Sequence, residues 1–113
     1  VDLVVADVSF ISLRLLVGPL ISVTRDDGWV LLLVKPQFEV GRELLGKGGV
    51  VHSPADQLQA ISSVIAAASE YGWHGVDAVP SRLLGASGNR EFFVLLRRTK
   101  SPAHLDLTAL VQT

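Results

Sequence analysis

Six consecutive apolar residues, Trp29–Val34, are the feature that most constrains what this chain can fold into. They lie between the polar turn 25–28 and Lys35, a length typical of a strand and too short for a buried helix. A strand that is apolar at every position is typical of parallel sheets, which are covered on both faces. We therefore predict a strand over residues 29–35 that is buried on both faces.

Three more strands are predicted from short apolar segments: a short buried strand at residues 3–6, and strands at 73–80 and 91–97. Helical patterns separate the first three strands, and such alternation implies right-handed crossovers and a parallel sheet. Only a glycine-containing loop joins the last two strands, so they should pair antiparallel. The expected fold is α/β, with parallel strands that end in an antiparallel hairpin, and it resembles the carboxyl half of the Rossmann-like methyltransferase sheet.

The first helix is predicted over residues 10–24, where apolar residues recur at helical spacing. Either Ser9 or Ser12 is suited to its N-cap. Pro19 falls in the middle of this segment and predicts a kink, because proline lacks the amide that a helix interior needs.

The second helix is predicted to begin at Ser53 and Pro54, with serine at the N-cap and proline at the first helical position. Gly72 is expected to end it. Residues 36–53 before it are irregular and rich in glycine. Loops of that length in compact domains tend to be functional or mobile.

Composition excludes several classes of protein. The chain has 113 residues, room for one domain, and 49% hydrophobic against 19% charged residues argues against disorder. The absence of cysteine excludes disulfides and cysteine nucleophiles and is compatible with a cytoplasmic location. A net charge of −1 provides no global attraction for nucleic acid, so any such contact must be local.

Neither a membrane span nor a metal site is indicated. No apolar segment reaches the ~18–20 residues that cross a bilayer. The histidines at positions 52, 74 and 104 are scattered and form no ligand pattern. The chain enters its first strand at once and contains no methionine, so we expect it to be the carboxyl portion of a longer protein.

Three ionisable residues stand at predicted strand ends. Asp7 follows the first strand, Lys35 follows the second, and Glu91 precedes the apolar residues of the last. In open α/β sheets ligands bind at the carboxyl ends of the strands, so these side chains are candidates for catalysis. Each also has an ordinary explanation: a solvated strand end for Lys35 and Glu91, and a helix N-cap for Asp7.

Four segments closely resemble the signature segments of the TlyA family within the FtsJ-like group. They are DVSFIS at 7–12, VKPQFE at 34–39, GKGGVV at 46–51 and GNREF at 88–92. The similarity runs from Val1 to about Arg98, and four motifs in order make chance agreement improbable. It implies a partial FtsJ-like methyltransferase domain at residues 1–98 and a polar carboxyl-terminal tail at 99–113.

The resemblance implies ribose 2′-O-methylation of ribosomal RNA with S-adenosylmethionine. The family carries a Lys-Asp-Lys-Glu tetrad, of which the last three members correspond to Asp7, Lys35 and Glu91. The first lysine, the glycine-rich cofactor loop and the S4-type RNA-binding domain have no counterpart in this chain. The resemblance further suggests Asp7, Val8, Ser9 and Phe10 for the cofactor. Lys47, in a glycine-rich loop, and Arg90, in a small basic cluster, are candidates for RNA contact.

Two alternatives remain open at this point. The family is also described as hemolysins, which would make the protein membrane-active. Because half of the expected cofactor site has no counterpart here, the chain is also compatible with a non-catalytic RNA-binding remnant. The expected partner is ribosomal RNA or a ribosomal subunit, and the sequence leaves the oligomeric state open.

Overall fold

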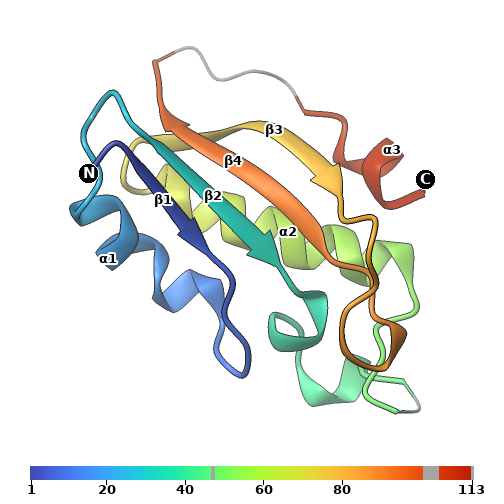
Figure 1. Ribbon diagram of the computed structural model, residues 1–113. Coiled ribbons are helices and arrows are strands. Elements are labelled where there is room, and N and C mark those ends of the chain that lie inside the picture. Colours follow the sequence, from blue (N-terminus) through green and yellow to red (C-terminus); the bar gives the residue numbers. More distant parts are fainter. Residues whose placement is uncertain (47, 101–104, 113) are drawn as a thin grey trace.

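The computed structural model describes residues 1–46, 48–100 and 105–112, which contain one four-stranded sheet (Figure 1). Its order is β1-β2-β4-β3. The strands span Leu3–Ala6 (β1), Trp29–Val34 (β2), Trp73–Pro80 (β3) and Phe92–Arg98 (β4). All four lie where the apolar segments predict them.

The directions of the strands confirm the predicted fold class. β1 and β2 are parallel, whereas β4 runs antiparallel to both β2 and β3. β3 and β4 form the expected antiparallel pair, and β4 lies between β2 and β3. The carboxyl ends of β1, β2 and β3 therefore meet the start of β4 at one end of the sheet, as Figure 1 shows.

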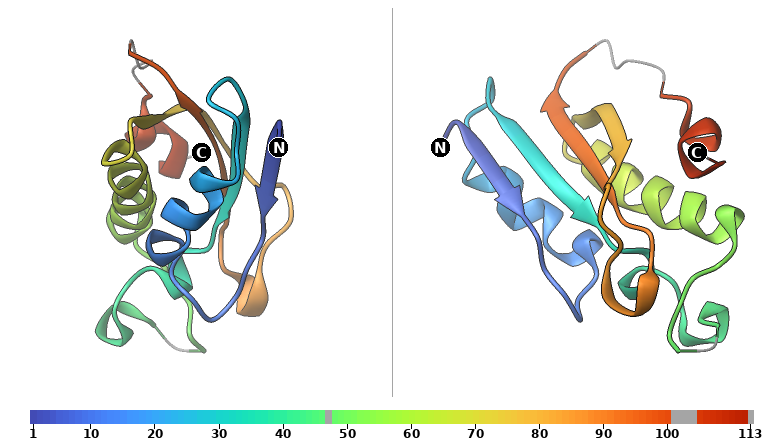
Figure 2. Two further views of the ribbon diagram at one scale, coloured as in Figure 1. Left: turned by 90° about the vertical axis from the view of Figure 1, so that its left-hand side faces the viewer. Right: turned by 45° about the vertical axis from the view of Figure 1, so that its right-hand side comes forward.

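The helices lie on one face of this sheet (Figure 2). The longest, α2 (Pro54–Ser69), begins as predicted: the Ser53 hydroxyl accepts a hydrogen bond from the amide of Asp56, and Pro54 occupies the first turn. Gly72, with φ 79°, follows its end. The short helix α3 (Leu107–Gln112) packs against α2 and β3.

The predicted helix over residues 10–24 is interrupted. A 3₁₀ turn, η1 (Leu13–Leu15), is followed after Leu16 by the helix α1 (Val17–Ser22). Ser12 is the N-cap of η1, and its hydroxyl accepts a hydrogen bond from the amide of Arg14. Pro19 lies in the first turn of α1, where its missing amide costs little, so the break falls before the proline.

The prediction that β2 is buried on both faces is wrong. Its residues alternate: Val30, Leu32 and Val34 are at most 1% exposed beneath the helices, whereas the residues between them are half-buried. Within the part of the chain that the structure describes, no helix covers the second face (Figure 2). An unbroken apolar run cannot tell one covered face from two.

The prediction that residues 3–6 form a buried strand is also wrong. β1 lies at the sheet edge, and Leu3 and Val5 are 55% and 61% exposed. Only Ala6 is buried, on the face that the helices cover. The segment is apolar, but among the described residues no strand pairs with its other side.

Part of the carboxyl-terminal segment predicted to be a polar tail is buried in the fold. Leu110 and Val111 of α3 are 8% and 3% exposed and belong to the hydrophobic core. Their burial results from packing across α2 and β3, which residue composition does not reveal. The predicted domain boundary at residue 98 stays a prediction.

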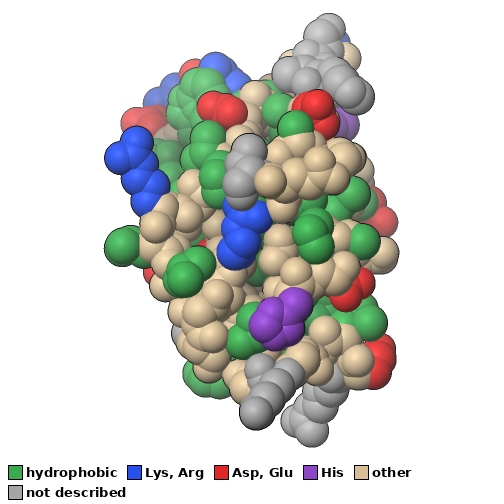
Figure 3. All heavy atoms as spheres, turned by 90° about the vertical axis from the view of Figure 1, so that its right-hand side faces the viewer, with side chains coloured by type: hydrophobic (Ala, Val, Ile, Leu, Met, Phe, Trp, Pro, Cys, Tyr) green, Lys and Arg blue, Asp and Glu red, His purple; other side chains and the backbone are tan. Residues whose placement is uncertain are grey.

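Two surface properties bear on function. On the face seen in Figure 3, Lys and Arg side chains are interspersed with hydrophobic, acidic and polar groups. Among the described residues, no helix combines the length and apolar character that crossing a membrane requires.

Candidate active site

Lys35 and Asp7 meet at the carboxyl ends of two parallel neighbours. β1 pairs with β2 up to Ala6, so the residues that follow the two strands emerge side by side. The Nζ of Lys35 lies 2.6 Å from Oδ1 of Asp7 and donates a 3.0 Å hydrogen bond to the hydroxyl of Ser9. The Lys35 side chain is 14% exposed and that of Asp7 60%, so a sheltered amine meets a carboxylate that faces solvent.

These contacts leave the amine with capacity to bind a further group. An ammonium carries three N–H donors, and Asp7 and Ser9 account for two of them. No other partner of Lys35 occurs among the described residues. A third donor is therefore free to engage a substrate oxygen.

Glu91 lies beside this pair but has a different partner. Val34 at the end of β2 pairs with Phe92 at the start of β4, which makes Lys35 and Glu91 neighbours across the two strands. The carboxylate of Glu91, in a residue 7% exposed, accepts a 3.1 Å hydrogen bond from Nε2 of Gln37. Gly85 packs so closely against that carboxylate that a Cβ there would collide with it.

Strand alternation, extended by one residue beyond each strand, predicts a common side for the three ionisable residues. Ala6, Val34 and Phe92 all point into the helix-covered core. Side chains alternate along a strand, so the residue next to each of them is directed to the other face. Asp7, Lys35 and Glu91 are those neighbours, and they lie at the same end of the sheet.

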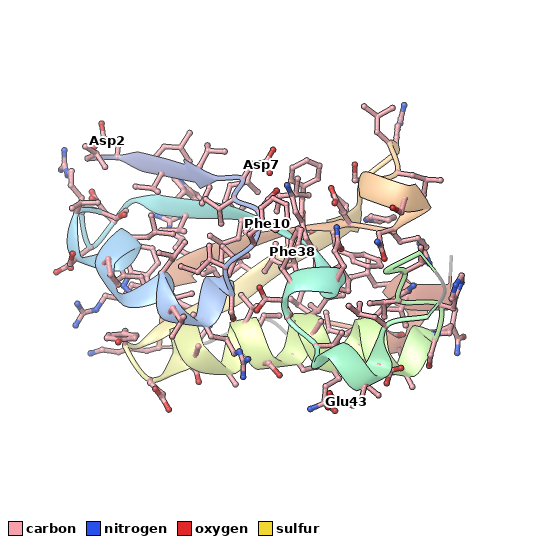
Figure 4. All side chains as sticks on the ribbon, turned by 90° about the horizontal axis from the view of Figure 1, so that it is seen from below. Asp2, Asp7, Phe10, Phe38 and Glu43 are labelled. Carbon is pink, nitrogen blue, oxygen red and sulfur yellow. The ribbon has the colours of Figure 1, made fainter. Side chains whose placement is uncertain are left out.

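Phe10 is the most exposed aromatic residue near this end of the sheet. Its side chain is 90% exposed, its φ is 67°, and its ring lies 5.1 Å from that of Phe38. Figure 4 shows Asp7, Phe10 and Phe38 close together, at the far end of β1 from Asp2. The segment predicted to bind the cofactor, residues 7–10, thus adjoins the amine, and its binding role stays a prediction.

The sequence did not predict a role for two buried polar side chains at this end of the sheet, Gln37 and Glu39. Gln37 lies in the 3₁₀ turn η2 (Pro36–Phe38) that follows β2, and Glu39 is the residue after that turn. Gln37 binds Glu91, and Glu39 accepts hydrogen bonds from the Ser12 hydroxyl at 2.6 Å and the Leu13 amide at 2.8 Å. The sequence feature that could have identified them is the polar residue at every second position directly after β2: Lys35, Gln37 and Glu39.

The pKa of Glu39 is raised above its ordinary value of 4.5. Burial is the main cause, because desolvation disfavours the charged carboxylate. The hydrogen bonds from Ser12 and Leu13 and the nearby charge of Arg14 act in the opposite direction.

The two residues predicted to contact RNA have different outcomes. Lys47 lies outside the described residues. The guanidinium of Arg90 donates a 2.8 Å hydrogen bond to the carbonyl of Val111 and lies over the ring of Phe92. These contacts account for Arg90 within the fold, and its RNA contact stays a prediction.

The glycine-rich segment before α2 is tied to the loop before β4. Asn89, which is 2% exposed, accepts a hydrogen bond from the amide of Val51 and donates one to the carbonyl of Gly49. The side chain of Gln57 in α2 also donates to the Val51 carbonyl. The segment before α2 and the loop before β4 are thereby held together.

Comparisons with known proteins support the resemblance noted in the sequence. The model of the FtsJ-like methyltransferase family matches residues 1–98. The 16S/23S rRNA (cytidine-2′-O)-methyltransferase TlyA of Mycobacterium tuberculosis is 48% identical over 97 residues, which are 86% of this chain and 36% of that protein. Hemolysin A of Brachyspira hyodysenteriae is 33% identical over 93 residues, or 80% of this chain and 38% of its own.

Solved structures share the fold. A protein from Streptococcus thermophilus proposed to be a hemolysin superposes with a TM-score of 0.89 at 36% identity, over 98% of this chain and 41% of its own. Another of that description from Lactococcus lactis reaches 0.91 at 33% identity, over 98% and 54%. The chain spans about a third of the length of the curated relatives that it matches.

Proposed function

This chain belongs to the FtsJ-like methyltransferase family, and we propose that it carries part of the catalytic centre for 2′-O-methylation of a ribose in ribosomal RNA. The observation that carries the proposal is the sheltered amine of Lys35, held between Asp7 and Ser9 at the carboxyl end of the sheet. The Mycobacterium tuberculosis relative is named as an rRNA (cytidine-2′-O)-methyltransferase, which supports the choice of substrate.

Lys35 orients the ribose hydroxyl in this proposal. The 2′-oxygen must be held in line with the methyl group, and its proton must leave as the new bond forms. With Lys35 as an ammonium, its third N–H binds that oxygen and stabilises the negative charge that develops on it, while the hydroxyl proton passes to solvent. A neutral Lys35 amine would instead accept the proton. Positioning of this kind supplies a large part of the acceleration when the methyl group is already activated.

Asp7 and Glu91 act through the amine. Asp7 contacts the ammonium directly and fixes its direction. Glu91 lies just before β4, whose start pairs with the end of β2, and its buried carboxylate adds negative potential near the amine. Both acids keep Lys35 at the place where the hydroxyl arrives.

The residues around the amine suit S-adenosylmethionine in their chemistry. This cofactor supplies an electrophilic methyl group on a sulfonium and carries an adenine ring. Asp7 offers a carboxylate that is 60% exposed, which attracts a positive charge, and Phe10 offers an aromatic surface that is 90% exposed. Residues 7–10 are therefore the proposed contribution of this chain to cofactor binding.

Transfer of labelled methyl groups from S-adenosylmethionine to ribosomal RNA tests the proposal. Nuclease digestion and mass spectrometry of the product should identify a 2′-O-methylated nucleoside. A product methylated on the base, or none from a folded protein that binds the cofactor, would overturn it.

The names of several relatives keep membrane activity as a second candidate. Release of dye from lipid vesicles measures it directly. Leakage by a protein that methylates no RNA would favour this candidate.

A further inference from the structure

Glu39 is a buried acid that the proposed chemistry does not use. Its side chain is 1% exposed, and its two oxygens accept hydrogen bonds from Ser12 and Leu13, which lie 27 and 26 residues earlier in the chain. Burying a carboxylate is costly unless its oxygens are hydrogen-bonded. Ser12 ends the connection between β1 and η1, and Leu13 is the first residue of η1, so the acid anchors the end of that connection.

The connection anchored in this way carries the groups that meet the amine. Asp7 and Ser9 contact Lys35, and Phe10 lies between them and the anchor. The φ of Phe10 is 67°, a region that residues with a bulky side chain rarely occupy. Such a conformation persists only where the surrounding structure holds it.

The anchor and the amine belong to one short, internally bonded segment. The amide of Phe38 donates to the carbonyl of Lys35 at 2.9 Å, and that of Glu39 donates to the carbonyl of Pro36 at 3.0 Å. Phe38 also contacts the ring of Phe10. Residues 35–39 therefore hold the connection after β1 at two places. Lys35 contacts Asp7 and Ser9 near the start of that connection, and Glu39 binds Ser12 and Leu13 at its end.

We propose that Glu39 is a positioning residue: by anchoring Ser12 and Leu13 it holds residues 7–12 in the conformation that presents Asp7 and Ser9 to Lys35. The effect on methyl transfer rests on the proposed function, whereas the effect on the amine itself does not. The two are therefore measured separately.

The test compares Glu39→Leu with Glu39→Gln. Leucine removes both acceptors, whereas glutamine keeps an acceptor for the Leu13 amide at similar volume. Glu43→Gln serves as the control, because Glu43 is exposed and lies four residues further along. The first readout is the NMR resonances of the Leu13 amide and of the Lys35 side chain, assigned with Lys35→Arg. The second is kcat and KM for methyl transfer.

Glu39→Leu should shift both resonances and lower kcat by about tenfold or more, with KM little changed, because a small misplacement of reacting groups costs that much. Glu39→Gln should restore the Lys35 resonance and most of the rate, and Glu43→Gln should leave both unchanged.

An unaltered Lys35 resonance in folded Glu39→Leu overturns the positioning role, whatever its activity. If the wild-type protein transfers no methyl group, the proposed function fails, and the two resonances still decide the role of Glu39. If Glu39→Leu does not fold, Ser12→Ala removes one of the donors and is judged by the same readouts.

Discussion

The side-chain amide of Gln37 donates a 3.1 Å hydrogen bond to the carboxylate of Glu91, joining the turn after β2 to the start of β4. Both residues are less than one-tenth exposed. The bond links positions 54 residues apart and fixes an acid beside the amine of Lys35. Four predictions concern this end of the sheet and its supports.

Gln37→Leu should lower the free energy of unfolding by about 2 kcal/mol, because it deprives a buried carboxylate of a hydrogen-bond donor. Urea denaturation measures the loss. Gln59→Leu is the matched control, since Gln59 lies on the exposed side of α2. Equal stability of the two variants would show that Glu91 does not depend on this donor.

Lys35→Ala should reduce methyl transfer on the order of 100-fold or more while the fold stays intact, because orientation of the reacting hydroxyl is lost. Its effect on unfolding should stay within about 1 kcal/mol, since the partner carboxylate is 60% exposed and screened by water. Kinetics and thermal denaturation of the same preparation check both statements. Lys100→Ala, at an exposed position, is the control, and turnover of Lys35→Ala equal to it would reject the assignment.

Gly85→Ala should destabilise the protein by about 1–3 kcal/mol, because the new Cβ would collide with the carboxylate of Glu91. Gly18→Ala makes the same change in α1, where the nearest atoms belong to the half-exposed ring of Tyr71 and can move aside. Chemical denaturation compares the two variants. A larger loss in Gly18→Ala would contradict the close packing of Glu91 against Gly85.

Glu39 should make the protein more stable at mildly acidic than at neutral pH, as far as this one residue contributes. Its pKa is raised in the folded state by burial, so folding favours the protonated carboxyl. The contribution is fully present below the ordinary value of 4.5 and is lost as the pH rises through the raised pKa.

Glu39→Gln should therefore flatten the stability profile in that window. Urea midpoints across a pH series measure the profile, with Glu43→Gln as the control. A profile that is steeper in Glu39→Gln than in the wild type would contradict the direction of the shift.

Local patterns in the sequence predicted the elements of the fold well. The serine and proline that begin α2 act at that helix's own end, and short apolar runs mark each strand. The kink predicted at Pro19 was misplaced: the interruption falls at Leu16, and Pro19 lies in the first turn of α1, where proline is tolerated. Caps, turns and strand periodicity depend on neighbours within a few residues, so one segment suffices to recognise them.

The sequence by itself thus determined the strands, the start of α2 and three ionisable residues at one end of the sheet. Tertiary structure alone decided which partner each side chain meets: Lys35 binds Asp7 and Ser9, whereas Glu91 binds Gln37. It also decided that β1 is an exposed edge and that the helices cover one face. The physical reason is that pairing and coverage arise between segments tens of residues apart, and no single segment records what will lie against it.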